Sequence, residues 1–120
     1  MKGGNVIQEK SYVFALRTVK LYRHLVEQKK EFVISKQILR SGTSIGANVE
    51  EAIGAQSPKD FFAKINIAYK EARETHYWLR LLRDSNYLTS IEISSMITDC
   101  EVLLKLSGSI IKTLKQKNDS

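Results

Sequence analysis

Small and apolar side chains recur every three or four residues along almost the entire chain, and this spacing is typical of amphipathic helices. Repeated strand-length alternation of apolar and polar residues is missing, and the 120 residues include one proline. Four segments carry the helical spacing, at about residues 8–29, 35–55, 57–83 and 89–115. The connections between them are short, so neighbouring helices should run antiparallel. We therefore predict one all-α domain over residues 1–120, an antiparallel up-down-up-down four-helix bundle.

Local signals mark the starts of the last two helices. Ser57 can cap a helix that has Pro58 at its first position. Thr89 and Glu92 match a capping box at the start of the fourth helix. The first segment is expected to turn its apolar stripe toward the core, and this stripe includes Val13, Leu16, Leu21 and Leu25.

The chain is basic, and this limits its expected partners. Lysine and arginine number 19 against 13 aspartate and glutamate, so the net charge is +6 and the pI is about 9.5. Such a balance favours polyanions, with RNA or DNA first and an anionic membrane second. No apolar run is long enough to span a bilayer, and no signal peptide is evident. We expect a soluble, cytoplasmic protein with no membrane partner.

The residues that usually carry catalysis are sparse and scattered. The two histidines, His24 and His76, fall on different predicted helices, and neither belongs to the Glu-x-x-His motif of bundle di-iron sites. Cys100 lies among apolar residues, which indicates a buried structural side chain. We therefore expect no enzymatic activity, no metal and no cofactor.

The second predicted helix has an unusual composition. Its glycines, Gly42 and Gly46, lower helix propensity by about 1 kcal/mol each relative to alanine, and close approach of another helix would offset this cost. A polar stripe runs beside them and can meet carboxylates of the third helix. These groups form either a solvated surface or a satisfied polar layer, inside the bundle or between subunits. The candidate residues for the oligomer interface or polar layer are Arg40, Gly42, Ser44, Gly46, Asn48, Glu51, Glu71 and Glu74.

Basic side chains are mixed with tyrosines on the first and third predicted helices. Cations neutralise phosphates, and aromatic faces can stack on unpaired bases. The alternative is an ordinary solvated helix face with tyrosines packed partly inward. The candidate nucleic-acid contacts are Arg17, Lys20, Arg23, Arg73 and Arg80.

Three runs of sequence resemble a known family. They are QILRSGTSIGANVEEA at residues 37–52, SPKDF at 57–61 and KEARET at 70–75. Together they resemble the signature of four-helix bundle proteins encoded in intervening sequences of bacterial large-subunit ribosomal RNA genes. The resemblance is specific because a glycine-containing helix is followed by a capped second motif at a fixed distance.

The same superfamily includes the accessory variability protein of diversity-generating retroelements, a ring-shaped homopentamer that associates with a reverse transcriptase and binds nucleic acid. The resemblance thus implies a bacterial, homopentameric bundle with nucleic acid, RNA in particular, as its leading partner. It also implies a reverse transcriptase as a partner if the gene lies in a retroelement. The alternative function is a protein-interaction scaffold that binds no nucleic acid and whose charge serves solubility or a protein partner.

Overall fold

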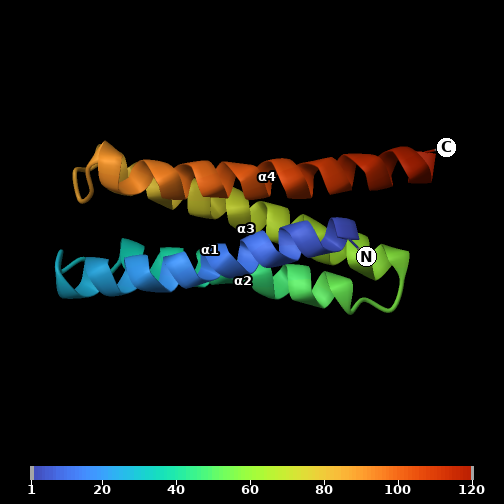
Figure 1. Ribbon diagram of the computed structural model, residues 1–120, viewed down its shortest axis with the longest axis horizontal. Helices are drawn as coiled ribbons and strands as arrows, with labels where there is room; N and C mark the ends of the chain where they lie inside the picture. Colours follow the sequence, from blue (N-terminus) through green and yellow to red (C-terminus); the bar gives the residue numbers. More distant parts are fainter. Residues whose placement is uncertain (1, 120) are drawn as a thin grey trace.

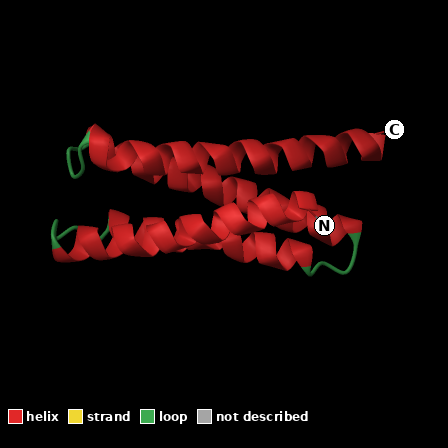
Figure 2. Ribbon diagram, viewed as in Figure 1, coloured by secondary structure: helices red, strands yellow, loops and turns green. Residues whose placement is uncertain are grey.

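The computed structural model describes the backbone of residues 2–119 and the side chains of residues 6–117. It contains four helices and, within the described range, no strand (Figure 2). The helices are α1 (Lys2–Glu27), α2 (Ile34–Ile53), α3 (Pro58–Asp84) and α4 (Ser90–Asp119). The bundle measures 50 × 22 × 22 Å. The predicted all-α four-helix bundle is confirmed.

Successive helices run in opposite directions along the long axis of the molecule, as the colour gradient in Figure 1 shows. Helix α1 packs against α2, α2 against α3, and α3 against α4, whereas α1 and α4 pack against each other least. Within the described part of the chain, the diagonal pairs α1–α3 and α2–α4 do not contact. The side of the bundle between α1 and α4 is therefore its most open side. None of the described helices is long and apolar enough to cross a bilayer.

The outer helices are longer than the sequence pattern predicts. Helix α1 begins at Lys2 where residue 8 was predicted, and α4 continues to Asp119 where residue 115 was predicted. The residues that follow Lys115 are good helix formers without proline, so the last helix has no local reason to stop there. Helix α2 ends at Ile53, because the N–H of Gly54 closes the last turn on the carbonyl of Glu50 at 3.1 Å.

The two predicted caps on the later helices are present. The hydroxyl oxygen of Ser57 accepts from the N–H of Asp60 at 3.0 Å, and Pro58 occupies the first turn of α3. In α4 the side chains of Thr89 and Glu92 each bind the other residue's backbone N–H, which completes the capping box. These contacts satisfy N–H groups that a helix start leaves without partners.

The core is apolar and follows the predicted seams for three of the four helices. Its largest fully buried side chains include Phe14, Leu25, Ile38, Ile45, Ile65, Leu79, Leu82, Ile93 and Leu103. The first helix departs from the prediction, because Val13 and Leu16 are 54% and 50% exposed. Phe14 and Thr18 take the buried positions of that helix instead. The physical reason is a rotation of α1 about its axis, which turns the neighbouring apolar stripe toward solvent.

Candidate functional site

The glycines of α2 are covered by α1 of the same chain. A Cβ atom on Gly42 would lie 2.6 Å from Cγ2 of Thr18, and one on Gly46 would lie 3.2 Å from the carbonyl oxygen of Ser11. Both glycines are buried. The close helix approach inferred from these glycines is therefore made inside the bundle, and they do not offer a free face to a second subunit.

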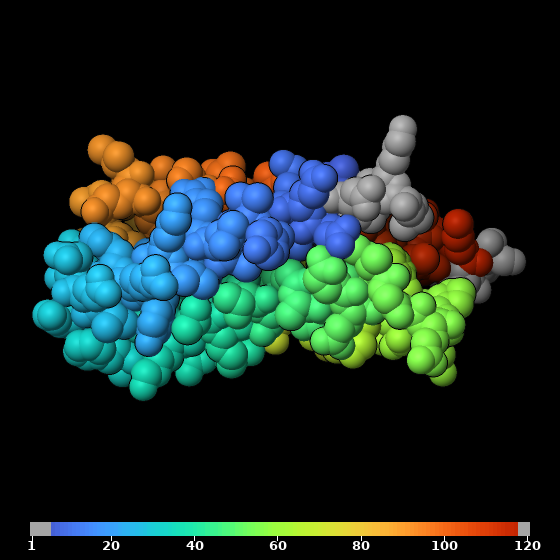
Figure 3. Space-filling model, turned by 60° about the horizontal axis from the view of Figure 1, so that its bottom comes forward, coloured from blue at the N-terminus to red at the C-terminus, as the bar shows by residue number. Residues whose placement is uncertain are grey.

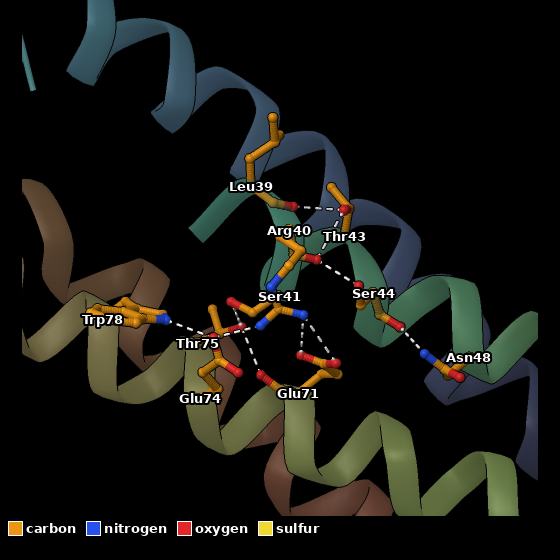
Figure 4. Close-up of polar contacts among 10 residues, drawn as sticks. All are labelled: Leu39, Arg40, Ser41, Thr43, Ser44, Asn48, Glu71, Glu74, Thr75 and Trp78. Carbon is orange, nitrogen blue, oxygen red and sulfur yellow. Dashed lines mark hydrogen bonds and ion pairs between the residues drawn. The ribbon is translucent and has the colours of Figure 1, made fainter. Parts of the chain in front are cut away.

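A cluster of charged side chains joins the outer edges of α2 and α3 (Figure 4). The guanidinium of Arg40 donates to Glu71 at 3.2 and 3.3 Å and to Glu74 at 2.5 Å. The indole N–H of Trp78 donates to Glu74 at 2.9 Å. The Trp78 N–H and the Arg40 guanidinium together hold the pKa of Glu74 below its usual value. We call Arg40, Glu71, Glu74 and Trp78 the Arg40 cluster.

This cluster lies at the rim of the bundle, not in a buried layer. The Arg40 side chain is 49% exposed, and both glutamates are only half-buried. The other predicted members of the layer make separate contacts. Ser44 and the half-buried Asn48 donate to carbonyls of their own helix, at 2.6 and 2.8 Å. The prediction of a polar layer is wrong for Glu51, which is exposed and pairs with Lys64 at 2.8 Å because its turn of α2 faces the start of α3.

The polar contact that is buried is made by two hydroxyl groups. The side-chain oxygens of Ser41 and Thr75 lie 2.8 Å apart beneath the Arg40 cluster, and both residues are inaccessible to solvent. Thr75 also donates to the Glu71 carbonyl at 2.8 Å. A hydrogen bond in this dry position aligns α2 and α3 along their length.

The candidate cations fall on two different parts of the surface. Arg17 of α1 reaches across to α4, where it binds the carboxylate of Asp99 and the hydroxyl of Ser95. Its charge is therefore already matched. Lys20 and Arg23 are exposed and form no ion pair with the described residues. Helix α1 covers the middle of the face seen in Figure 3, between α2 and α4, and α3 is almost hidden behind it.

The candidate cations of α3 lie beside tyrosine rings. The guanidinium carbons of Arg73 and Arg80 each lie 6.0 Å from a ring centroid, those of Tyr69 and Tyr77 respectively. Both arginines are exposed, and neither forms an ion pair with any described residue. Because α1 and α3 are diagonal in the bundle, the structure does not join the two sets of candidate cations into one surface.

The open side between α1 and α4 is an additional feature that the sequence analysis missed. Two hollows of about 350 and 310 Å³ lie along it, one beside Val13 and Asp99 and the other beside Lys20 and His24. Exposed apolar side chains of α1 border this side, among them Val6, Tyr12, Val13 and Leu16. The signal in the sequence was an apolar stripe on the first helix wider than one packing face needs.

Glu31 is a second residue whose role was not predicted. Its carboxylate accepts the backbone N–H groups of Val33, Ile34 and Ser35 at 3.1, 3.0 and 2.6 Å, and the residue is 6% exposed. Burial raises the pKa of Glu31, but these hydrogen bonds outweigh burial and hold the pKa below its usual value. The carboxylate thus caps α2 in place of an N-cap side chain.

The groups that could react do not converge. His76 pairs with Glu101 at 3.1 Å, and His24 lies on the other side of the bundle, on α1. Burial raises the pKa of Cys100 to about 12, so its sulfur remains a thiol at neutral pH. Among the side chains of residues 6–117, no group of three or more histidine, cysteine or carboxylate residues could hold a metal ion. The expectation of a non-catalytic protein stays a prediction.

These features define a small, basic four-helix bundle whose surface offers exposed arginine–tyrosine pairs and an open, partly apolar side. The chain belongs to the 23S rRNA-intervening sequence protein family, whose model matches residues 4–109. It is similar to a protein of unknown function from the S23 ribosomal protein family of Bacteroides thetaiotaomicron, whose crystal structure was determined at 1.70 Å resolution. The two are 55% identical, with a TM-score of 0.89 over 92% of this chain and 98% of that chain. A comparison with curated proteins finds no significant match.

Proposed function

We propose that this protein is a non-catalytic, homo-oligomeric bundle that binds nucleic acid, RNA first, through its basic helix faces. The observation that carries the proposal is the pair of exposed arginines on α3, Arg73 and Arg80, each placed beside a tyrosine ring without an acidic partner among the described residues. An unmatched cation attracts phosphate, and an adjacent ring can stack on an unpaired base. The net charge of +6 acts in the same direction over longer distances.

The oligomer is proposed to form through the open side between α1 and α4. Tyr12, Val13 and Leu16 expose apolar surface next to this side, and a second subunit would cover it. A pentameric ring, as in the related retroelement proteins, would repeat the cations of α3 around one assembly. Several weak phosphate contacts would then act together.

The link to the accessory variability protein of diversity-generating retroelements is part of the same proposal. If the gene lies in a retroelement, a reverse transcriptase would be a further partner. The alternative is a protein-interaction scaffold, and one observation favours it. The exposed apolar side chains of α1 suit a protein partner as well as they suit a second copy.

The test compares two variants of equal charge by fluorescence anisotropy with a structured RNA. Arg73→Gln/Arg80→Gln removes both cations of the α3 face, and Lys36→Gln/Lys59→Gln removes two exposed lysines at helix starts elsewhere. We expect the arginine variant to weaken binding about tenfold or more and the lysine variant to weaken it much less. Equal losses would mean that net charge alone attracts RNA, and no binding by the wild-type protein would favour the scaffold.

A further inference from the structure

A shallow hollow lies between α3 and α4, toward the C-terminal end of α4. Its volume is about 430 Å³, and its lining includes Asn66, Tyr69, Gly108, Ile111, Lys112 and Lys115. Tyr69 is half-buried and forms one wall. Gly108 forms the opposite wall, because a Cβ atom there would lie 3.5 Å from Cε1 of Tyr69. The missing side chain leaves the ring of Tyr69 accessible from the hollow.

The charge around this hollow is positive and locally unmatched. Residues 102–117 of α4 contain four lysines and no aspartate or glutamate, and residues 61–70 of α3 contain no acidic residue either. Lys112 and Lys115 are exposed and form no ion pair with the described side chains. Arg73 adds a third cation, since its guanidinium donates to the Tyr69 hydroxyl at 3.4 Å.

The hollow also offers a polar group that can accept a hydrogen bond. The Asn66 amide nitrogen donates to the carbonyl of Phe62 at 2.9 Å, which leaves the side-chain oxygen of Asn66 without a partner among the described residues. An amide oxygen beside an aromatic ring suits the exocyclic amine of a nucleobase. The three elements of nucleotide recognition, namely ring, cation and acceptor, therefore lie within one hollow.

We propose that this hollow is a subsite for a single nucleotide of an unpaired strand. The base stacks on Tyr69, and Lys112 and Lys115 hold the flanking phosphates. The proposal rests on the proposed function and narrows it, because a base held in a duplex is stacked on its neighbours and cannot reach a ring set between two helices. The expected ligand is therefore single-stranded RNA, or the unpaired loop of a structured RNA.

The experiment measures anisotropy of a fluorescein-labelled oligouridylate and of the same label on an RNA duplex. Wild-type protein should bind the single strand more tightly. Tyr69→Leu should weaken single-strand binding about tenfold and leave duplex binding unchanged, which is the loss expected for one stacked base. Tyr69→Phe keeps the ring and should retain most of the affinity. Lys112→Gln/Lys115→Gln should lower the salt dependence by up to about two phosphate contacts.

Tyr69 packs against the small apolar cluster around Ile65, so circular dichroism must verify that its variants fold. Gly108→Leu gives an independent test, because it fills the hollow from the opposite wall and leaves Tyr69 in place. It should also weaken single-strand binding about tenfold. Lys36→Gln/Lys59→Gln is the control of matched charge.

The outcomes separate this subsite from the proposed function. If the oligouridylate binds and neither Gly108→Leu nor the lysine variant weakens binding beyond the control, the hollow is not the subsite, although nucleic-acid binding stands. If neither RNA binds the wild-type protein at low salt, both proposals fail. Equal binding of polyglutamate, independent of Tyr69, would indicate an acidic protein partner and overturn the nucleotide subsite.

Discussion

The side-chain oxygens of Ser41 and Thr75 lie 2.8 Å apart in a position without access to solvent, and they join α2 to α3 directly beneath the Arg40 cluster. Water cannot replace either partner there, so each hydroxyl depends on the other or on a helix carbonyl. This contact is the buried part of the polar interface between the two helices. The charged groups above it remain in contact with solvent.

The first prediction concerns this hydrogen bond. Thr75→Val keeps the shape of the side chain and removes its hydroxyl, so Ser41 loses its partner on α3. The free energy of unfolding should fall by about 1–3 kcal/mol, as measured by urea denaturation. Thr113→Val is the control, because Thr113 is exposed on α4. Adding Ser41→Ala should recover part of the loss, and an equal effect of both threonine changes would contradict the account.

The second prediction uses two glycines that differ in their surroundings. Gly42→Ala places a methyl group 2.6 Å from the buried Thr18, so α1 and α2 must move apart, at a cost of about 1–3 kcal/mol. Gly108→Ala meets an ordinary contact of 3.5 Å and should raise stability by about 0.5–1 kcal/mol through helix propensity. Thermal unfolding of both variants decides this. A stabilised Gly42→Ala would mean that α1 does not approach α2 this closely.

The third prediction concerns the cap of α2 and its pH dependence. Hydrogen bonds from three backbone N–H groups lower the pKa of Glu31 despite its burial. The cap therefore contributes stability above the unfolded pKa of about 4.3, and this contribution is lost as pH falls through the lower pKa of the folded protein. Glu31→Gln should reduce unfolding free energy at pH 7 by about 1–2 kcal/mol and flatten its dependence on acid.

Glu27→Gln is the control for this prediction, since Glu27 is exposed at the end of α1. Denaturation midpoints of the three proteins between neutral pH and acid are the measurement. If Glu27→Gln and Glu31→Gln behave alike, the Glu31 carboxylate does not hold the start of α2.

Sequence patterns were sufficient for the fold because each helix carries its own periodic apolar seam. The seam of α3, for example, includes Ala68, Ala72 and Leu79, and all three are buried. The pattern could not decide which of two neighbouring stripes on α1 faces the core, so Val13 and Leu16 were assigned wrongly. That choice depends on the rotation of the helix against its partners, which no local rule fixes.

The candidate site was less predictable because it depends on contacts between helices. The contact between Arg40 and the two glutamates of α3 was anticipated, but its exposure was not. Asn48 bonds to a carbonyl of its own helix, so its loss should matter less than a layer between helices would require. Glu31 escaped notice because it caps α2 from a turn that precedes the helix, outside the usual spacing.

The fourth prediction concerns assembly. The exposed apolar residues beside the open side of the bundle should be covered in solution, so light scattering at micromolar concentration should give a multiple of the 13.7 kDa chain mass, with five copies expected. Leu16→Lys should shift the mass toward that of one chain, whereas Ile67→Lys, at an exposed apolar position on α3, should not. A clean monomer mass for the wild-type protein would contradict the proposed oligomer.

The fifth prediction tests the central claim that the basic surfaces bind nucleic acid. Each phosphate contact releases counterions, so the affinity of the wild-type protein for a structured RNA should fall steeply as salt rises. Fluorescence anisotropy over a salt series is the measurement. The account predicts tight binding at low salt, a linear decrease of log affinity against log salt, and little dependence on base sequence. The absence of binding at the lowest salt concentration would contradict it.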